Sequence, residues 1–360
     1  MAARTHVHSI DNQLTGPSTG QPADPAVAAL PSRPVLSTAR RRCWRDQRSL
    51  QFGRSSTSAV VLSGLDPGAR RVLKLLDGTR TTAAVLIDGA AAGCPPPRTI
   101  RLLTLLHEAG LLEDAAQGHP ALAALTTAER DQLAPDLATL RLQDAPHPGD
   151  ALARRRTADV VVLGAGRVGA PLANLLEGAG VGQVLLVDDG LARLADVVAG
   201  GVPVGSVGLR RGPAALPSSA SVAVLAPAAG EPLAALLPQL PVGAPHLLAE
   251  VREATGVVGP FVLPGQTPCL RCLDLDRTDR DPGWPALAGQ LADPAPGPTA
   301  CAGPLAVAVA AQACLQVLTL LDGPARPASV GGTLELTLPD WRWRRRSWPA
   351  HPACGCGARP

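Results

Sequence analysis

The sequence predicts an α/β protein built around a parallel sheet and preceded by a small α+β domain. Three observations predict this fold class. Near the middle of the chain a buried-strand pattern runs into a glycine-rich turn and an apolar helix; two close pairs of cysteines follow; and short strand and helix signals fill the first third. With 360 residues, the chain is long enough for two domains.

The composition is that of a globular protein. Hydrophobic residues make up 46% of the chain, and the net charge of +3 is too small to indicate nucleic-acid binding. Residues 1–30 lack the apolar stretch of a secretory signal, and the apolar run from Leu305 to Leu321 falls short of a bilayer span. We therefore predict a cytoplasmic protein with no membrane segment and no nucleic-acid partner.

The first third divides into a leader and a compact domain. Residues 1–31 contain Gly, Pro, Ser and Thr without periodicity, so we expect a disordered leader. Residues 32–115 show short strands, three short helices and a closing strand, which together predict a small winged-helix-like α+β domain. These elements are expected to open at Leu50, Ala59, Pro67, Thr81 or Thr82, Pro97 and Ala109.

The 32–115 stretch resembles the PqqD-like leader-recognition domains of ribosomal-peptide maturation. The resemblance lies in the turn from Leu76 to Thr81 and in the ending from Leu102 to Leu112. It implies a domain that binds an extended precursor or leader peptide by adding it to a sheet edge. A purely structural winged helix is the alternative, as is one that binds DNA through Arg70, Arg71, Arg98 and Arg101.

Three further segments are expected along the chain. Residues 116–156 are rich in Ala, Pro and Asp with one weak helix near Thr127 to Leu142, so we predict a linker, and we expect Arg154 to Arg156 at the exposed edge of the next strand. The α/β domain should cover 157–340. A C-terminal strand and a metal-binding tail should cover 341–360.

The glycine-rich turn predicts a Rossmann-like phosphate loop. The strand Asp159 to Leu163 runs into Gly164, Gly166 and Gly169, which would provide a tight turn, close approach to a phosphate and close helix packing. Asp188 ends the next predicted strand, where a carboxylate can accept a hydrogen bond from a ribose hydroxyl. The pattern alone does not choose between NAD, FAD, SAM and ATP.

The cysteine pairs predict a structural zinc site. Cys269 and Cys272 form one pair and Cys354 and Cys356 the other, and four thiolates complete a tetrahedral Zn²⁺ site. His351 could replace one ligand or bind a thiolate from behind. Unrelated free thiols and a redox-active Cys-x-x-Cys remain the alternatives.

The glycine loop, the Pro-Cys-x-x-Cys pair, a long apolar helix and the final cysteine pair together resemble the ThiF/MoeB family of ubiquitin-activating-like adenylyltransferases. The resemblance covers Ala158 to Gly357. It implies that ATP would be held by the glycine loop and Asp188, with Arg211 as a phosphate clamp where the family has lysine. The family's magnesium-binding aspartate is missing, because residues 226–230 read Ala-Pro-Ala-Ala-Gly. We therefore expect adenylation to be lost, with ATP and Mg²⁺ binding as the open alternative.

The resemblance is nearest to members found in bacteriocin and azole-peptide maturation, including cyclodehydratase partner proteins. It implies a protein that presents a leader peptide to a partner modifying enzyme, and it is compatible with a homodimer. Two alternative hypotheses make the protein an enzyme. It is either an active adenylyltransferase that uses Arg211, or an NAD- or FAD-linked oxidoreductase. Cys301 as a nucleophile and His246 facing the nucleotide are weaker candidates than ordinary structural roles.

Overall fold

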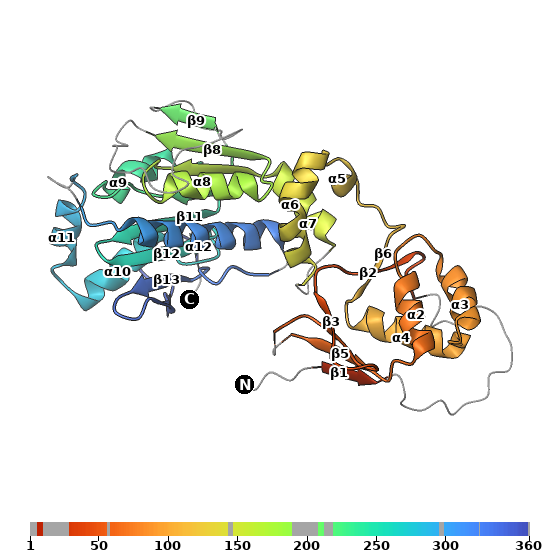
Figure 1. Cartoon of the computed structure of the whole chain (residues 1–360). Helices are drawn as coiled ribbons and strands as arrows, with labels where there is room; N and C mark the ends of the chain where they lie inside the picture. The colour runs from red at the N-terminus through yellow and green to blue at the C-terminus, as the bar shows by residue number, and fades with distance from the viewer. Residues whose placement is uncertain are drawn as a thin grey trace. The chain divides into compact units, whose positions relative to one another are not determined.

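The computed structural model describes residues 6–9, 29–55, 58–142, 147–188, 208–211, 219–294, 299–323 and 325–358. The chain divides into two compact units, which we call the N-terminal unit, Met1–Ala123, and the C-terminal unit, Ala124–Pro360 (Figure 1). Each has its own hydrophobic core. The two units are described separately below.

The N-terminal unit is the expected small α+β structure. Strands β1, β5, β4 and β3 form one sheet in that order, β2 pairs with β6, and three helices pack together over a buried leucine core. Its elements are β1 His6–Ser9, β2 Pro34–Leu36, β3 Arg42–Trp44, β4 Leu50–Phe52, β5 Val60–Ser63, α2 Pro67–Leu75, α3 Thr82–Ala91, α4 Pro96–Glu108, β6 Leu112–Asp114 and α5 Pro120–Ala123.

Two of the three predicted helix starts of this unit are confirmed by their caps, whereas α4 begins at Pro96, one residue before the predicted Pro97, and has no side-chain cap. The Asp66 side chain accepts the backbone N–H of Ala69 at 2.7 Å, and Thr81 accepts that of Ala84 at 3.2 Å. The closing strand begins at Leu112 rather than at Ala109, because the chain first turns through Gly110, which has a φ of +64°.

The predicted disordered leader needs a correction at one place. Residues His6–Ser9 form strand β1, which pairs parallel to β5, with His6 opposite Val60 and Ser9 opposite Ser63. Four residues without apolar periodicity gave no strand signal, because the pairing comes from a sheet edge that lies far away in the sequence. Residues 1–5 and 10–28 of the expected leader lie outside the described residues.

The C-terminal unit is built on an eight-stranded mixed sheet in the order β14-β13-β12-β11-β10-β7-β8-β9. Strands β7 to β11 run parallel and the last three alternate. Its elements are α6 Thr127–Leu140, α7 Pro148–Thr157, β7 Asp159–Leu163, α8 Gly169–Gly178, β8 Gln183–Asp188, β9 Gly208–Arg211, β10 Val222–Leu225, α9 Leu233–Leu236, a 3-10 turn Leu237–Gln239, β11 His246–Arg252, β12 Thr255–Val262, α10 Leu270–Arg280, α11 Trp284–Gln290, α12 Gly303–Asp322, β13 Gly332–Thr337 and β14 Arg342–Ser347.

Both faces of the parallel strands are buried, as the continuous apolar runs predict. Along β7, Val160 and Val162 face the core beneath α8 and α12, whereas Val161 and Leu163 face the core beneath α9 and α10. Helices α8 and α12 lie side by side on one face (Figure 1). The fold is therefore a three-layer α/β structure.

Helix α12 is long and apolar enough to cross a membrane by length and composition, but half of it is buried within the unit. Ala306, Val309, Ala310 and Ala313 on one side of it pack into the core with no exposed surface. It is therefore the core helix that the sequence predicts.

The segment 116–156 carries more structure than the predicted linker. Helices α6 and α7 belong to the C-terminal unit, and Arg154 to Arg156 end α7 instead of forming a strand edge. Arg155 is buried, and its guanidinium donates to both oxygens of Asp322 at 2.6 and 2.7 Å and to the Ala179 carbonyl at 2.9 Å. The sequence predicted an exposed strand edge here because Asp322, the acidic partner of Arg155, lies 167 residues further along the chain.

Candidate zinc centre and glycine loop

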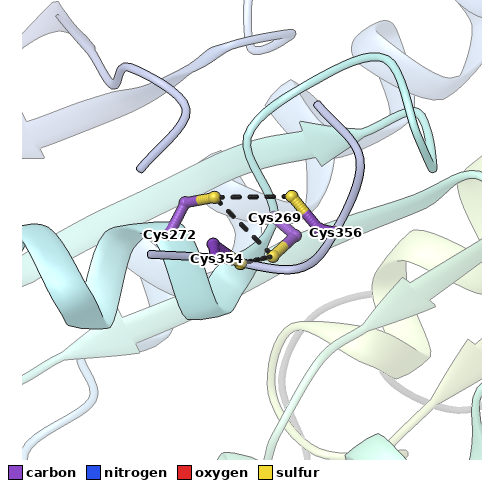
Figure 2. A group of neighbouring side chains, drawn as sticks. All are labelled: Cys269, Cys272, Cys354 and Cys356. Atoms are coloured by element: carbon purple, nitrogen blue, oxygen red, sulfur yellow. Dashed lines mark hydrogen bonds between the residues drawn. The ribbon is translucent and has the colours of Figure 1, made fainter. Parts of the chain in front are cut away.

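The four cysteines of the two predicted pairs meet in space (Figure 2). Cys269 is the N-cap of α10 and Cys272 lies in its first turn, so both sulfurs point from the same end of the helix. Cys354 and Cys356 come from the tail that follows β14. The tail is thus brought back to residues more than eighty positions earlier in the chain.

The geometry of these sulfurs fits a zinc ion. The Sγ atoms of Cys269 and Cys354 are 3.6 Å apart, as are those of Cys272 and Cys356, and Cys269 and Cys272 are 3.9 Å apart. Four sulfurs at about 2.3 Å from a tetrahedral Zn²⁺ lie about 3.8 Å from one another. All four sulfurs fall within 4.8 Å of each other, so donor type, number and spacing agree with a structural zinc site.

The pKa values of the clustered cysteine thiols are shifted by their surroundings. Burial raises the pKa of Cys269 to about 12 and also raises the pKa of Cys272. For Cys356, burial acts in the same direction, but the backbone N–H of Ala358 and the neighbouring thiols outweigh it and lower the pKa to about 7. Four thiolates in this space repel each other unless a cation compensates them, and metal binding would therefore release protons.

Trp348 and His351 lie around the four cysteines and make hydrogen bonds to neighbouring residues. Trp348 is buried beside Cys272 and Leu273, and its indole N–H donates to the Thr333 hydroxyl at 3.1 Å. The His351 ring uses Nε2 toward Asp279 at 2.9 Å and accepts the Ala353 N–H at its Nδ1 atom at 3.2 Å. Because both ring nitrogens are engaged, His351 is not part of the cluster, which the four cysteines form by themselves.

The glycine loop has the expected tight geometry. Gly164 has a φ of +103°, and a Cβ on it would lie 2.1 Å from the Ala226 carbonyl oxygen. A Cβ on Gly169 would lie 1.8 Å from the Gly164 oxygen. These two positions therefore admit only glycine, because strand β7, helix α8 and the end of β10 approach one another through their backbones.

The middle glycine, Gly166, packs against the segment that follows β10. A Cβ on Gly166 would meet the Cα and Cβ of Ala228 at 3.0 and 3.1 Å, in the segment that follows β10. In the same segment the Glu231 carboxylate accepts the Ala228 N–H at 2.7 Å. Glu231 is the first acidic residue after the position where the family has its magnesium-binding aspartate, and its carboxylate is thus engaged by a backbone N–H of the same segment.

Asp188 and Arg211 end neighbouring parallel strands and are opposite each other in the β8–β9 register. They lie at the same edge of the sheet as Gly164, because β7 pairs parallel to β8 with Leu163 opposite Val187. The side chains of Asp188 and Arg211, and the residues 189–207 that follow β8, lie outside the described residues. A role for these two residues in nucleotide binding stays a prediction.

The loop also contains a residue that sequence reasoning missed. Arg167 occupies a variable position of the glycine pattern, yet its guanidinium donates to the Cys301 carbonyl at 2.6 Å, just before α12. It joins the loop to the start of the core helix. No local pattern signals it, because the Cys301 carbonyl is a backbone group 134 residues further along the chain.

The weaker candidates have structural roles. His246 begins β11 opposite Ala223 of β10, and its Nδ1 atom lies 3.0 Å from the Ala244 carbonyl. Burial lowers its pKa, so the ring is neutral near pH 7. Cys301 is half-buried just before α12, and its backbone carbonyl accepts a hydrogen bond from Arg167 at 2.6 Å.

We predict that Gly169→Ala will lower the stability of the C-terminal unit by about 3 kcal/mol, because the clashing Gly164 oxygen is backbone and cannot move aside. Urea denaturation measures this. Gly178→Ala is the matched control: it lies in the same helix, no atom lies within 4 Å of its would-be Cβ, and alanine there should be neutral or stabilising by up to about 1 kcal/mol. Equal effects of the two substitutions would contradict the packing role of Gly169.

The mixed sheet, its glycine loop and the four-cysteine centre define a ThiF-type α/β fold with a small α+β region in front. Neither a protein-family model nor a curated protein matches the sequence.

Solved structures do match. E. coli MccB with ATP superposes with a TM-score of 0.63 at 14% identity, covering 90% of this chain and 99% of that chain. The microcin C7 biosynthetic enzyme MccB in complex with N-formylated MccA gives a TM-score of 0.62 at 14% identity, with coverages of 90% and 99%. PaaA gives 0.60 at 17% identity, with coverages of 86% and 98%. The chain therefore shares the fold of MccB, including its N-terminal part.

Proposed function

We propose that this chain is a peptide-maturation protein that binds a ribosomal precursor peptide with its N-terminal unit and presents it to a partner modifying enzyme. The observation that carries the proposal is the likeness to MccB over 90% of the chain, since that protein was solved in complex with the peptide MccA. The chain pairs the same kind of fold with an α+β unit whose sheet has an exposed edge. Extended peptides bind to such edges through backbone hydrogen bonds.

In this proposal the C-terminal unit serves mainly as a scaffold. The four-cysteine centre holds a structural zinc ion that anchors the tail to α10. Adenylation is lost, because Ala226 to Gly230 supply no magnesium ligand and Glu231 is turned onto the Ala228 N–H. The protein acts in the cytoplasm, and a homodimer stays a prediction from the family resemblance.

The peptide-binding part is tested with the labelled product of any short open reading frame that neighbours the gene for this chain. Fluorescence anisotropy of the labelled peptide with the full chain should give saturable binding, and hydrogen exchange should show protection in the N-terminal unit. A peptide that fails to bind, or one that protects only the C-terminal unit, would overturn the proposal.

The second candidate function is an active ATP-dependent adenylyltransferase. The register that places Asp188 beside Arg211 at the glycine-loop edge favours it, because a ribose acceptor and a phosphate clamp would then be neighbours.

We expect calorimetry of the full chain to show no magnesium-dependent ATP binding, since the metal has no carboxylate anchor at 226–230. ATP–pyrophosphate exchange with the precursor peptide should likewise stay at the background rate. Micromolar, magnesium-dependent binding together with exchange would establish the adenylyltransferase instead, and Arg211→Ala would then be expected to abolish it.

A further inference from the structure

The N-terminal unit contains a groove that no role has been given. It is a cavity of about 520 Å³ between strand β3 and helix α2, a volume typical of ligand sites. Its floor is apolar: Leu36 and Leu50 are 3% exposed and Leu73 is 6% exposed. Its rim is cationic, with Arg42 on the strand and Arg70, Arg71 and Lys74 on the helix.

The rim cations have no acidic partners among the described residues. Arg70 stacks on the Trp44 ring at 4.5 Å and donates to the Gln47 carbonyl at 3.4 Å, and Arg71 donates to the Ala92 carbonyl at 2.7 Å. Neither contact neutralises charge. Within residues 29–123 the sequence has 13 Arg and Lys against 7 Asp and Glu, a charge of +6 that exceeds the +3 of the whole chain. The groove therefore attracts anions.

Strand β3 also offers an open edge. It pairs only with β4, in the antiparallel register of Cys43 with Gln51, and no strand of the described chain covers its other side. The opposite edge of the sheet, on β5, is occupied by His6–Ser9 of the chain itself. Of the two edges, the one beside the cationic groove is the one left for a partner strand.

The structure disfavours DNA as the occupant. Arg98, one of the four arginines considered for DNA, is turned inward: its Nε lies 3.2 Å from Asp66 and its Nη2 donates to the Gly64 carbonyl at 2.9 Å. A DNA backbone binds through its phosphates and would gain no contact from the buried leucines of the groove floor. An extended peptide, in contrast, can pack every second side chain against them.

We propose that an acidic peptide segment binds here as a strand added to β3, with apolar side chains over Leu50 and Leu73 and carboxylates against Arg42 and Lys74. The proposal rests on the proposed peptide-binding function and names the chemistry of its ligand: alternating acidic and apolar residues. Backbone hydrogen bonds to β3 hold the peptide, and the rim charges select it.

The test uses the full chain and a labelled peptide of alternating glutamate and valine. We expect saturable binding that weakens with salt, and no binding of the lysine–valine analogue. Arg42→Glu/Lys74→Glu should weaken binding by about tenfold. Arg54→Glu/Arg101→Glu is the matched control, because it makes the same change in net charge at two exposed arginines outside the groove and should leave the affinity unchanged.

The outcomes separate this site from the proposed function. If the Arg42→Glu/Lys74→Glu variant binds the precursor peptide with unchanged affinity, the groove proposal is wrong and the proposed peptide binding stands. If the precursor fails to bind while the glutamate–valine peptide binds in a groove-dependent way, the site stands without the proposed function. Equal effects of the groove and control variants, equal binding of both charged peptides, or tighter competition by a DNA duplex would each overturn the site.

Discussion

Replacing the two tail cysteines, Cys354→Ser/Cys356→Ser, will remove about one zinc ion per chain and lower the melting temperature by about 10 °C. A ligand that binds only the folded state at a thousand times its Kd contributes about 4 kcal/mol, and 1 kcal/mol corresponds to about 2–4 °C in a unit of this size. The tail would detach if, as proposed, a metal ion holds Cys354 and Cys356 against the end of α10. Metal analysis and calorimetric melting measure both effects.

A chelator should reproduce the loss in the unmodified protein, more readily at low pH, because protons compete for the thiolates. Cys43→Ser is the control, since Cys43 lies in the other unit, far from the centre in the sequence. If metal content and melting temperature are the same in the tail variant as in this control, the four thiols do not form a zinc site.

Arg155→Met will destabilise the C-terminal unit by about 3–5 kcal/mol, because it leaves the Asp322 carboxylate buried without its partner. The pair is almost completely covered, with side chains 6% and 11% exposed, and it joins the end of α7 to the end of α12. Urea denaturation at constant protein concentration gives the loss directly.

The double variant Arg155→Met/Asp322→Leu should regain most of that stability, because no charge is then left unpaired in the core. Arg326→Met is the matched control: it removes an exposed arginine a few residues after α12 and should change stability by less than about 0.5 kcal/mol. A double variant as unstable as the single one would show that packing around Arg155, and not the carboxylate, sets the loss.

Local patterns predicted many of the elements, although not β1 or α7. The run Asp159–Leu163 followed by three glycines predicted β7, the loop and α8, and Asp66 and Thr81 predicted helix starts that their side chains do cap. These signals concern contacts within a few residues, where propensity and capping decide. The net charge of the whole chain, in contrast, did not indicate that the N-terminal unit is basic, because it sums the charges of two compact units.

The candidate sites divide in the same way. The four-cysteine cluster was predictable because thiols have a restricted chemistry, so two close pairs already indicate a shared metal site. The partners of Arg155, Arg167 and Glu231 were not, since Asp322, the Cys301 carbonyl and the Ala228 N–H are ordinary groups that carry no sequence signal.

By itself the sequence determined the fold class, the glycine loop and the four cysteines that form the cluster, because each depends on residue types at short spacing. Only the tertiary structure decided that His6–Ser9 occupies the β5 edge, that β3 stays open beside a cationic groove, and that α7 is tied to α12 through a buried ion pair. Those features arise where segments distant in sequence meet, and the energy of such contacts depends on burial and partners that no local pattern encodes.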